Sequence, residues 1–145
     1  MNETVKLTQQ GDYLFSNSFG AEVPALNSDE PPPLGKGAGP SPVQLLEAAV
    51  GNCLAASLVF ALRKYKQSAE PVSASVEATT GRNEQNRLRV QRLAVRITLG
   101  VPAAQVERLD RALAQFEEYC TVTQSVRTAI PVDVEVFDSE GRRLK

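Results

Sequence analysis

Two cysteines are the residues of this 145-residue chain whose type and setting could support covalent chemistry. Cys53 lies in the long, nearly uncharged run GAGPSPVQLLEAAVGNCLAASLVFAL, and Cys120 lies just before TVTQSVRTA. The chain has no histidine, which excludes Ser-His-Asp and Cys-His nucleophilic sites within it, and it has no glycine-rich phosphate-binding motif. Two thiols cannot complete a usual zinc site unless carboxylates or a second subunit contribute. We therefore expect cysteine redox chemistry or none, with no metal and no cofactor.

The two cysteines have different predicted surroundings. Cys120 precedes a short helix expected over residues 121–129 and opened by a capping box of Thr121 and Gln124, where the positive end of the helix dipole favours a thiolate. Cys53 is expected deep inside its own helix, where burial disfavours the thiolate unless a cation or a hydrogen-bond donor approaches. The alternative is that both are core thiols, because free cysteine is among the most buried residue types.

Composition excludes several classes of partner. The 16 Lys and Arg residues nearly balance the 17 Asp and Glu residues, and the net charge is −1. This balance argues against nucleic acid and against an anionic membrane surface. The N-terminus does not read as a secretory signal, and the apolar stretch of residues 53–62 is too short to span a bilayer. We expect a single cytoplasmic domain over residues 1–145.

Hydrophobic periodicity and turn residues predict an α+β domain without internal repeats. A hairpin of two strands, a third short strand and a proline-rich loop come first, followed by a long helix, two strands, two helices and a last strand before a polar tail. In order, these elements are expected at residues 4–8, 12–19, 22–26, 27–40, 42–62, 71–80, 87–100, 103–118, 121–129 and 130–137. The apolar phase of the fifth strand slips near Gln91 and Arg92, which predicts a β-bulge. The helix at 103–118 is amphipathic, with one apolar stripe of Val106, Leu109, Leu113 and Phe116.

The long helix is expected to begin with Ser41 as its N-cap and Pro42 as its first residue. Residues 45–62 are apolar or small nearly all round, so the helix must be buried on most sides. One small sheet would leave part of it uncovered, and a partner helix in a homodimer is the expected cover. Gly51 is less favourable than alanine in a helix interior by about 1 kcal/mol, which indicates a close contact or a pocket there.

These residues resemble a known family. The segment SPVQLLEAAVGNCLAASL is similar to the signature of the OsmC/Ohr superfamily, in which a long helix opened by a proline carries a cysteine. The segment YCTVTQSVRTAIPVDVEV is similar to the family's second cysteine, which opens a helix that carries an arginine and precedes a valine-rich strand; here these are Cys120, Arg127 and residues 132–136. The resemblance implies the OsmC-like fold as an intertwined homodimer. In that fold the two long helices pack centrally and each active site lies at the subunit interface.

The resemblance also implies a thiol peroxidase. In that mechanism the thiolate of Cys53 attacks the O–O bond of an organic hydroperoxide and becomes a sulfenic acid, while an alcohol is released. Cys120 then condenses with the sulfenic acid to form a disulfide, which a dithiol reductant reopens. Cys53 would be the peroxidatic cysteine and Cys120 the resolving one.

The chain departs from the family pattern near the first cysteine. Active members usually place a glutamate directly after the helix-opening proline, where it orients an arginine from the N-terminal segment beside the cysteine. Position 43 is Val43, and the first arginine of the chain is Arg63. The earlier cations are Lys6 and Lys36, and Lys36 is the candidate to approach Cys53 of its own or the partner subunit. The alternative for Lys36 is a solvated loop lysine.

Other polar residues offer no clear substitute for the missing pair. Glu47 and Gln44 point about 120° and 180° away from Cys53 around a helix. Arg127 follows Cys120 by two helical turns, about 10.5 Å, and either supplies positive charge near that thiol or has a surface or capping role. An alternative function therefore remains open: an OsmC-like dimer that binds a small apolar ligand, with structural or redox-sensing thiols.

Overall fold

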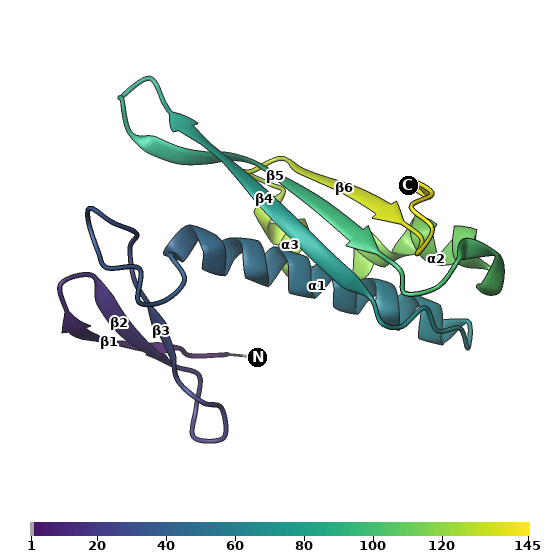
Figure 1. Ribbon diagram of the computed structural model, residues 1–145, viewed down its shortest axis with the longest axis horizontal. Coiled ribbons are helices and arrows are strands. Elements are labelled where there is room, and N and C mark those ends of the chain that lie inside the picture. The colour runs from purple at the N-terminus through teal and green to yellow at the C-terminus, as the bar shows by residue number, and fades with distance from the viewer. Residues whose placement is uncertain (1) are drawn as a thin grey trace. The chain divides into compact units, whose positions relative to one another are not determined.

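The computed structural model describes residues 2–145 and divides into two compact units, one ending at Leu46 and the other running from Glu47 to Lys145 (Figure 1). The order of elements is β-β-β-α-β-β, a series of short helices and a final strand, as the sequence predicts. The α+β class is therefore confirmed, while the single domain over residues 1–145 stays a prediction.

The first unit contains an antiparallel sheet in the order β1-β2-β3, formed by Lys6–Gly11, Leu14–Ser18 and Leu26–Ser28. The predicted hairpin of the first two strands is confirmed, but the third strand lies later than residues 22–26. Its position is fixed by the buried Asn17, whose side-chain amide donates to Leu26 O at 2.8 Å and to Ser28 Oγ at 2.8 Å.

The proline-rich loop after β3 is organised by one buried carboxylate. Asp29 Oδ2 accepts hydrogen bonds from the backbone N–H groups of Lys36 and Ala38, each at 3.0 Å, and Oδ1 accepts from Glu30 N at 2.9 Å. The hydrogen bond from Ala38, with those from Lys36 and Glu30, holds the pKa of Asp29 below its usual range despite burial. The backbone at Lys36 is thus fixed by Asp29, whatever its side chain does.

Helix α1, Pro42–Lys64, begins where the sequence predicts. Ser41 Oγ accepts from Gln44 N at 3.2 Å and Gln44 Oε1 accepts from Ser41 N at 2.9 Å, so the two residues form a reciprocal capping box. By length and composition the 23-residue helix could cross a membrane, with a mean hydropathy of 1.9 over its most apolar window. Val50, Leu54 and Leu58 are completely buried, so one side of the helix packs in the core.

The second sheet has the order β4-β5-β6, with β4 (Ser73–Arg82) antiparallel and β6 (Val132–Phe137) parallel to the central β5 (Leu88–Thr98). Thr79 pairs with Arg92 and Thr80 with Val90, so the unpaired Gln91 forms the predicted bulge.

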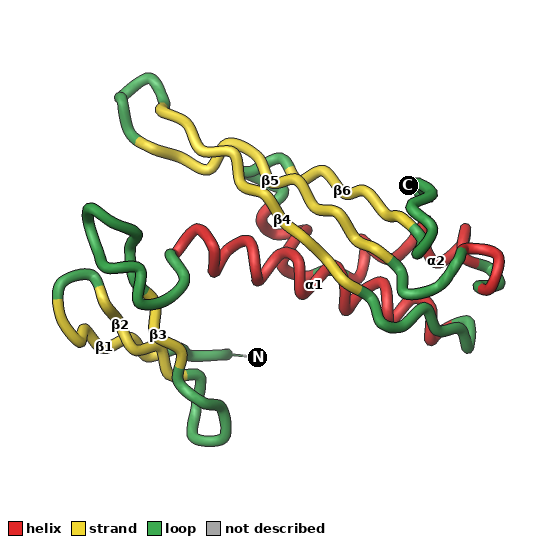
Figure 2. The backbone as a smooth tube through the Cα atoms, in the orientation of Figure 1, coloured by secondary structure: helices red, strands yellow, loops and turns green. Residues whose placement is uncertain are grey.

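The first half of β5 is largely exposed to solvent, and Leu88 is 63% exposed. The reason is that β6 pairs with β5 only over Leu93–Thr98, and the β4–β5 hairpin extends beyond it (Figures 1 and 2).

Helices cover one face of this sheet (Figure 2). The predicted helix at 103–118 is instead three segments, η1 (Ala103–Gln105), α2 (Leu109–Gln115) and η2 (Phe116–Tyr119). Arg108, with a φ of 55°, adopts a left-handed conformation that breaks the helix. The predicted apolar stripe is nevertheless buried at all of its positions, which are Val106, Leu109, Leu113 and Phe116. Helix α3, Thr121–Val126, is shorter than expected.

The C-terminal segment is ordered rather than a free polar tail. The buried Asp138 accepts hydrogen bonds from the N–H groups of Ala103, Glu140 and Arg142 at 2.9 to 3.1 Å. Leu144 N donates to Val136 O at 2.7 Å, which holds the last residues against β6.

Candidate functional site

The structure brings the two cysteines together from different elements of the second unit. Cys53 lies in the middle of α1 and is half-buried, whereas Cys120 lies between η2 and α3 and is completely buried. Both are free thiols. Burial raises the pKa of the Cys120 thiol above its ordinary range, and the neighbouring Cys53 thiol raises it further by a hydrogen bond and by its charge.

Cys120 caps α3, which corrects the predicted capping box of Thr121 and Gln124. Its Sγ accepts a hydrogen bond from Thr123 N at 3.4 Å and donates one to Thr123 Oγ1 at 3.0 Å. Gln124 Nε2 instead donates to Glu117 O at 3.0 Å. The hydrogen bonds with Thr123 lower the pKa of Cys120, as expected at a helix start, but burial and Cys53 outweigh them.

A surface hollow of about 410 Å³ opens beside Cys53. It is lined by Cys53, Ala56, Ser57, Phe60 and Tyr119. The rings of Phe60 and Tyr119 meet edge to face with their centroids 5.2 Å apart, and the side chains are 56% and 38% exposed. The half-buried thiol therefore faces a space bounded by small and aromatic side chains.

Lys64 places a positive charge beside Tyr119. Its Nζ donates to Tyr119 Oη at 3.1 Å and lies 5.5 Å from the centre of that ring. The hydrogen bond with Tyr119 raises the pKa of Lys64. A lysine is thus held against Tyr119, one of the residues that line the hollow.

Helix α1 lies close to the edge strand β4 at Gly51 and Glu47. A Cβ at Gly51 would lie 2.7 Å from Val76 Cγ2, so the glycine permits the close approach that its position in the helix predicts. Glu47 Oε1 accepts a hydrogen bond from Ala78 N at 2.8 Å, which occupies this carboxylate with the sheet rather than with Cys53.

Lys36 lies in the loop of the first unit. Its side chain is 83% exposed, and Nζ is 3.9 Å from the carboxylate of Asp12. Its approach to Cys53 stays a prediction.

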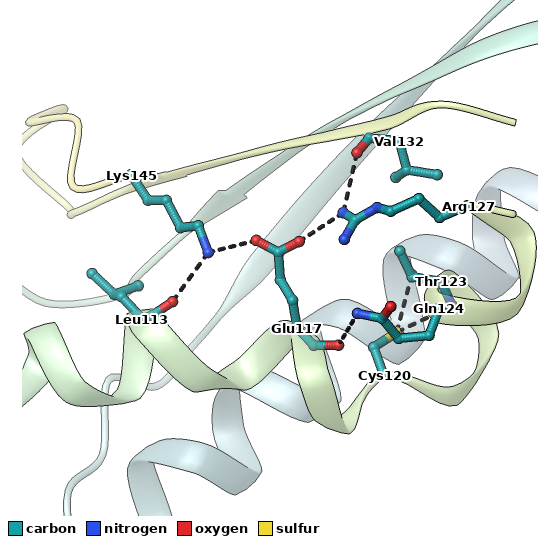
Figure 3. Close-up of polar contacts among 8 residues, drawn as sticks. All are labelled: Leu113, Glu117, Cys120, Thr123, Gln124, Arg127, Val132 and Lys145. Carbon is teal, nitrogen blue, oxygen red and sulfur yellow. Dashed lines mark hydrogen bonds and ion pairs between the residues drawn. The ribbon is translucent and has the colours of Figure 1, made fainter.

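Arg127 belongs to an ion group that sequence reasoning missed (Figure 3). Its Nη2 donates to Glu117 Oε2 at 2.6 Å and to Val132 O at 3.1 Å, while Lys145 Nζ approaches Glu117 Oε1 at 2.6 Å. Arg127 is therefore engaged by Glu117 and Val132, and the sulfur of Cys120 bonds to Thr123 instead. The sequence offers little sign of this group, because Lys145 lies in a segment that reads as a polar tail.

Comparison with protein-family models decides the family. The model described as OsmC-like protein matches residues 35–135. The chain belongs to the OsmC-like family. The resemblance predicted from the two cysteine segments is thereby confirmed, and no curated protein matches this chain.

Solved structures share the fold over nearly the whole OsmC-like chain. A putative osmotic stress induced and detoxification response protein from Psychrobacter arcticus is 21% identical, with a TM-score of 0.79 over 94% of this chain and 96% of its own. An organic hydroperoxide resistance protein OsmC from Legionella pneumophila is 19% identical, with a TM-score of 0.67 over 94% and 96%. The organic hydroperoxide resistance protein OhrB of Bacillus subtilis is 15% identical, with a TM-score of 0.68 over 92% and 97%. The predicted OsmC-like fold is thus confirmed.

Proposed function

We propose that this OsmC-like protein reduces organic hydroperoxides, with Cys53 as the peroxidatic cysteine and Cys120 as the resolving cysteine. The observation that carries the proposal is the pairing of a half-buried thiol on a surface hollow with a second, fully buried thiol beside it. Family membership and the likeness to proteins described as organic hydroperoxide resistance proteins support a peroxide-resistance or redox-related role.

The reaction takes three steps. The Cys53 thiolate attacks one oxygen of the hydroperoxide, an S–O bond forms as the O–O bond breaks, and the departing alkoxide takes a proton to become an alcohol. The Cys120 thiolate then attacks the sulfenic sulfur, an S–S bond forms as the S–O bond breaks, and hydroxide leaves and is protonated to water. An external dithiol reduces the disulfide and becomes a disulfide itself.

Burial supports this assignment of roles. A peroxide from solution can reach the half-buried Cys53 through the hollow, whereas Cys120 is completely buried. Oxidation of thiols follows exposure as well as thiolate character. The small and aromatic lining, which includes Ala56 and Phe60, suits the organic part of the peroxide.

The mechanism needs a cation that favours the Cys53 thiolate, and Val43 stands where the family pattern has the glutamate that orients an arginine for this role. We propose Lys36 for this role. The variant Lys36→Met is expected to slow peroxide reduction about tenfold, whereas Lys6→Met, which removes the other cation before Arg63, is expected to leave the rate unchanged. Equal rates in the two variants would remove Lys36 from the site.

We also propose that the protein acts as a homodimer. Ala49, Asn52, Ala56 and Phe60 are exposed along one face of α1, and small side chains there allow another helix to approach closely. A second copy of the same helix is the expected occupant, since Val50, Leu54 and Leu58 on another side of α1 are already buried within the chain.

One observation favours a second candidate, a binding protein for a small apolar ligand. The rings of Phe60 and Tyr119 line an accessible hollow, and the raised pKa of Cys120 leaves its thiol protonated at neutral pH. In that case the thiols would be structural or redox-sensing, and binding would not consume a peroxide.

Peroxide consumption separates the two candidates. With dithiothreitol as reductant, we expect the protein to consume cumene hydroperoxide and Cys53→Ser to be inactive. Cys120→Ser should accumulate a sulfenic acid that dimedone traps, because the resolving thiol is missing. The peroxidase would be overturned if the protein consumed no hydroperoxide, or if Cys53→Ser consumed it at the same rate. Binding of cumene itself without turnover would then support the protein that binds an apolar ligand.

A further inference from the structure

A half-buried ion group lies beside Cys120 (Figure 3). The side chain of Glu117 is only 16% exposed, and its two carboxylate oxygens contact Arg127 Nη2 and Lys145 Nζ at 2.6 Å each. Burial alone raises the pKa of Glu117, but the hydrogen bonds and charges of Lys145 and Arg127 outweigh burial and hold the pKa below its usual range. Glu117 is therefore ionised at neutral pH and held from both sides.

Arg127 and Lys145 connect Glu117 to neighbouring elements. Arg127, the C-cap residue of α3, also donates to Val132 O at 3.1 Å at the start of β6. Lys145 donates to Leu113 O in α2 at 3.1 Å. Arg127 Nε is buried and has no hydrogen-bond partner within residues 2–145. The hydrogen bonds of Nη2 with Glu117 and Val132 therefore have to compensate for burying this part of the guanidinium.

Glu117 contacts both ends of α3. At the N-terminal end its backbone carbonyl accepts from Cys120 N at 3.1 Å and from Gln124 Nε2 at 3.0 Å. At the C-terminal end its carboxylate holds Arg127. A helix of six residues is too short to be stable by itself, so the direction of its N-cap sulfur must be set by tertiary contacts of this kind.

We propose that Glu117 is a positioning residue for Cys120, held in place by Arg127 and Lys145. This inference rests on the proposed function, in which the Cys120 thiol condenses with the Cys53 sulfenic acid to give a disulfide and water. Disulfide formation requires a narrow range of sulfur and Cβ positions. Loosening α3 therefore slows the condensation, while the attack of Cys53 on the peroxide does not involve Cys120 and keeps its rate.

The test follows the two steps separately after mixing with cumene hydroperoxide. In Glu117→Gln we expect disulfide formation to slow by about tenfold or more and the dimedone-reactive sulfenic acid to accumulate, with its rate of formation within about twofold of the wild type. Arg127→Lys should retain more of the disulfide rate than Arg127→Met, because lysine still pairs with the carboxylate. The matched control is Glu70→Gln, which breaks the exposed Arg63–Glu70 pair of 2.8 Å and should change neither step.

Diamide, a two-electron oxidant of thiols, separates failure of this inference from failure of the proposed function. It closes the disulfide without a peroxide, so Glu117→Gln should be slower with diamide as well. If the wild type forms the disulfide with diamide but does not react with the hydroperoxide, the peroxidase is overturned. Slower disulfide formation by Glu117→Gln with diamide would then still support the positioning role. Equal closure rates of wild type and Glu117→Gln would overturn the positioning role, and so would an inability of the wild type to form the disulfide with either oxidant.

Folding of the variants is checked by circular dichroism before the kinetics. If Glu117→Gln does not fold, Lys145→Met replaces it, because this variant keeps the Glu117–Arg127 pair and removes a contact from a partly exposed side chain. We expect Lys145→Met to slow disulfide formation by about threefold or more. An unchanged rate in a folded Lys145→Met would overturn the inference.

Discussion

The sulfur of Cys120 accepts a hydrogen bond from the backbone N–H of Thr123 and donates one to the hydroxyl of the same residue, at 3.4 and 3.0 Å. A thiol therefore does the work that serine or aspartate usually does at the start of a helix. The state of this one sulfur affects both the stability of α3 and the chemistry of the site.

Thr123→Val is expected to raise the pKa of Cys120 further. Valine matches the shape of threonine but removes the buried hydroxyl, whose hydrogen bond lowers that pKa, and the backbone N–H stays in place. The ultraviolet absorbance of the thiolate, followed against pH in a Cys53→Ala background, measures the change. Thr121→Val, at an exposed neighbouring position, is the control and should leave the titration unchanged.

Cys53→Ala is expected to lower the pKa of Cys120. It removes the hydrogen bond and the charge of the neighbouring thiol, both of which raise that pKa, and it leaves the effect of burial in place. The ultraviolet absorbance of the thiolate, followed against pH, measures the change. An unchanged Cys120 titration after the substitution would mean that the two sulfurs do not interact.

The ion pairs of Glu117 are expected to make stability depend on pH. Because the folded pKa of Glu117 is lowered, the stabilisation is complete above the unfolded value of about 4.3 and is lost as the pH falls through the folded pKa. Glu117→Gln should lower the free energy of unfolding by about 2 kcal/mol near neutral pH. As the pH falls, the free energy of unfolding should then decrease less in the variant than in the wild type. Urea denaturation at several pH values tests this, with the exposed Glu118→Gln as the control; parallel pH curves for Glu117→Gln and wild type would contradict it.

Gly51→Ala is expected to destabilise the protein although alanine favours helix. The added methyl would lie 2.7 Å from Val76 Cγ2, so the Val76 side chain or the backbone of α1 or β4 must shift, at a cost of about 1 to 3 kcal/mol. The double variant Gly51→Ala with Val76→Ala should recover part of the loss because the second change makes room for the first. Additive losses in thermal or urea unfolding would show that the two residues are not in contact.

Phe60→Asp is expected to weaken the proposed dimer. Phe60 is 56% exposed on α1, and a carboxylate there would have to be buried without a partner when a second helix packs on that face. Sedimentation equilibrium at micromolar concentration should show a dimer for wild type and mainly monomer for the variant. Leu88→Asp, at an equally exposed position on the β4–β5 hairpin, should stay dimeric; a wild-type monomer would rule out the arrangement.

Local sequence rules predicted much of the fold. The bulge at Gln91 follows from a phase slip in an alternating strand, and the start of α1 follows from Ser41 and Pro42. The apolar stripe of Val106, Leu109, Leu113 and Phe116 is buried as expected even though its helix is broken at Arg108. A helical period predicts which side chains face the core. It does not predict that the helix is continuous, because one left-handed residue can interrupt the backbone while the same side chains stay buried.

Of the candidate site, the sequence predicts only the two cysteines, and their catalytic roles stay a prediction. Cysteine types and spacing identify Cys53 and Cys120, but the capping role of the sulfur replaced the capping box that Thr121 and Gln124 suggested. The contacts of Glu117 were invisible because they depend on which distant segments fold against it. Lys145 reaches it from the end of the chain, and no local pattern connects those two positions.

Because the sulfur of Cys120 caps α3, oxidation of that sulfur would be detectable in the backbone of the helix. When that sulfur forms a bond to another atom, the hydrogen bond that it accepts from the backbone N–H of Thr123 is weakened or lost. The exchange of this amide proton with solvent, or its chemical shift, then reports through the backbone whether the buried thiol has reacted, without any label at the cysteine itself.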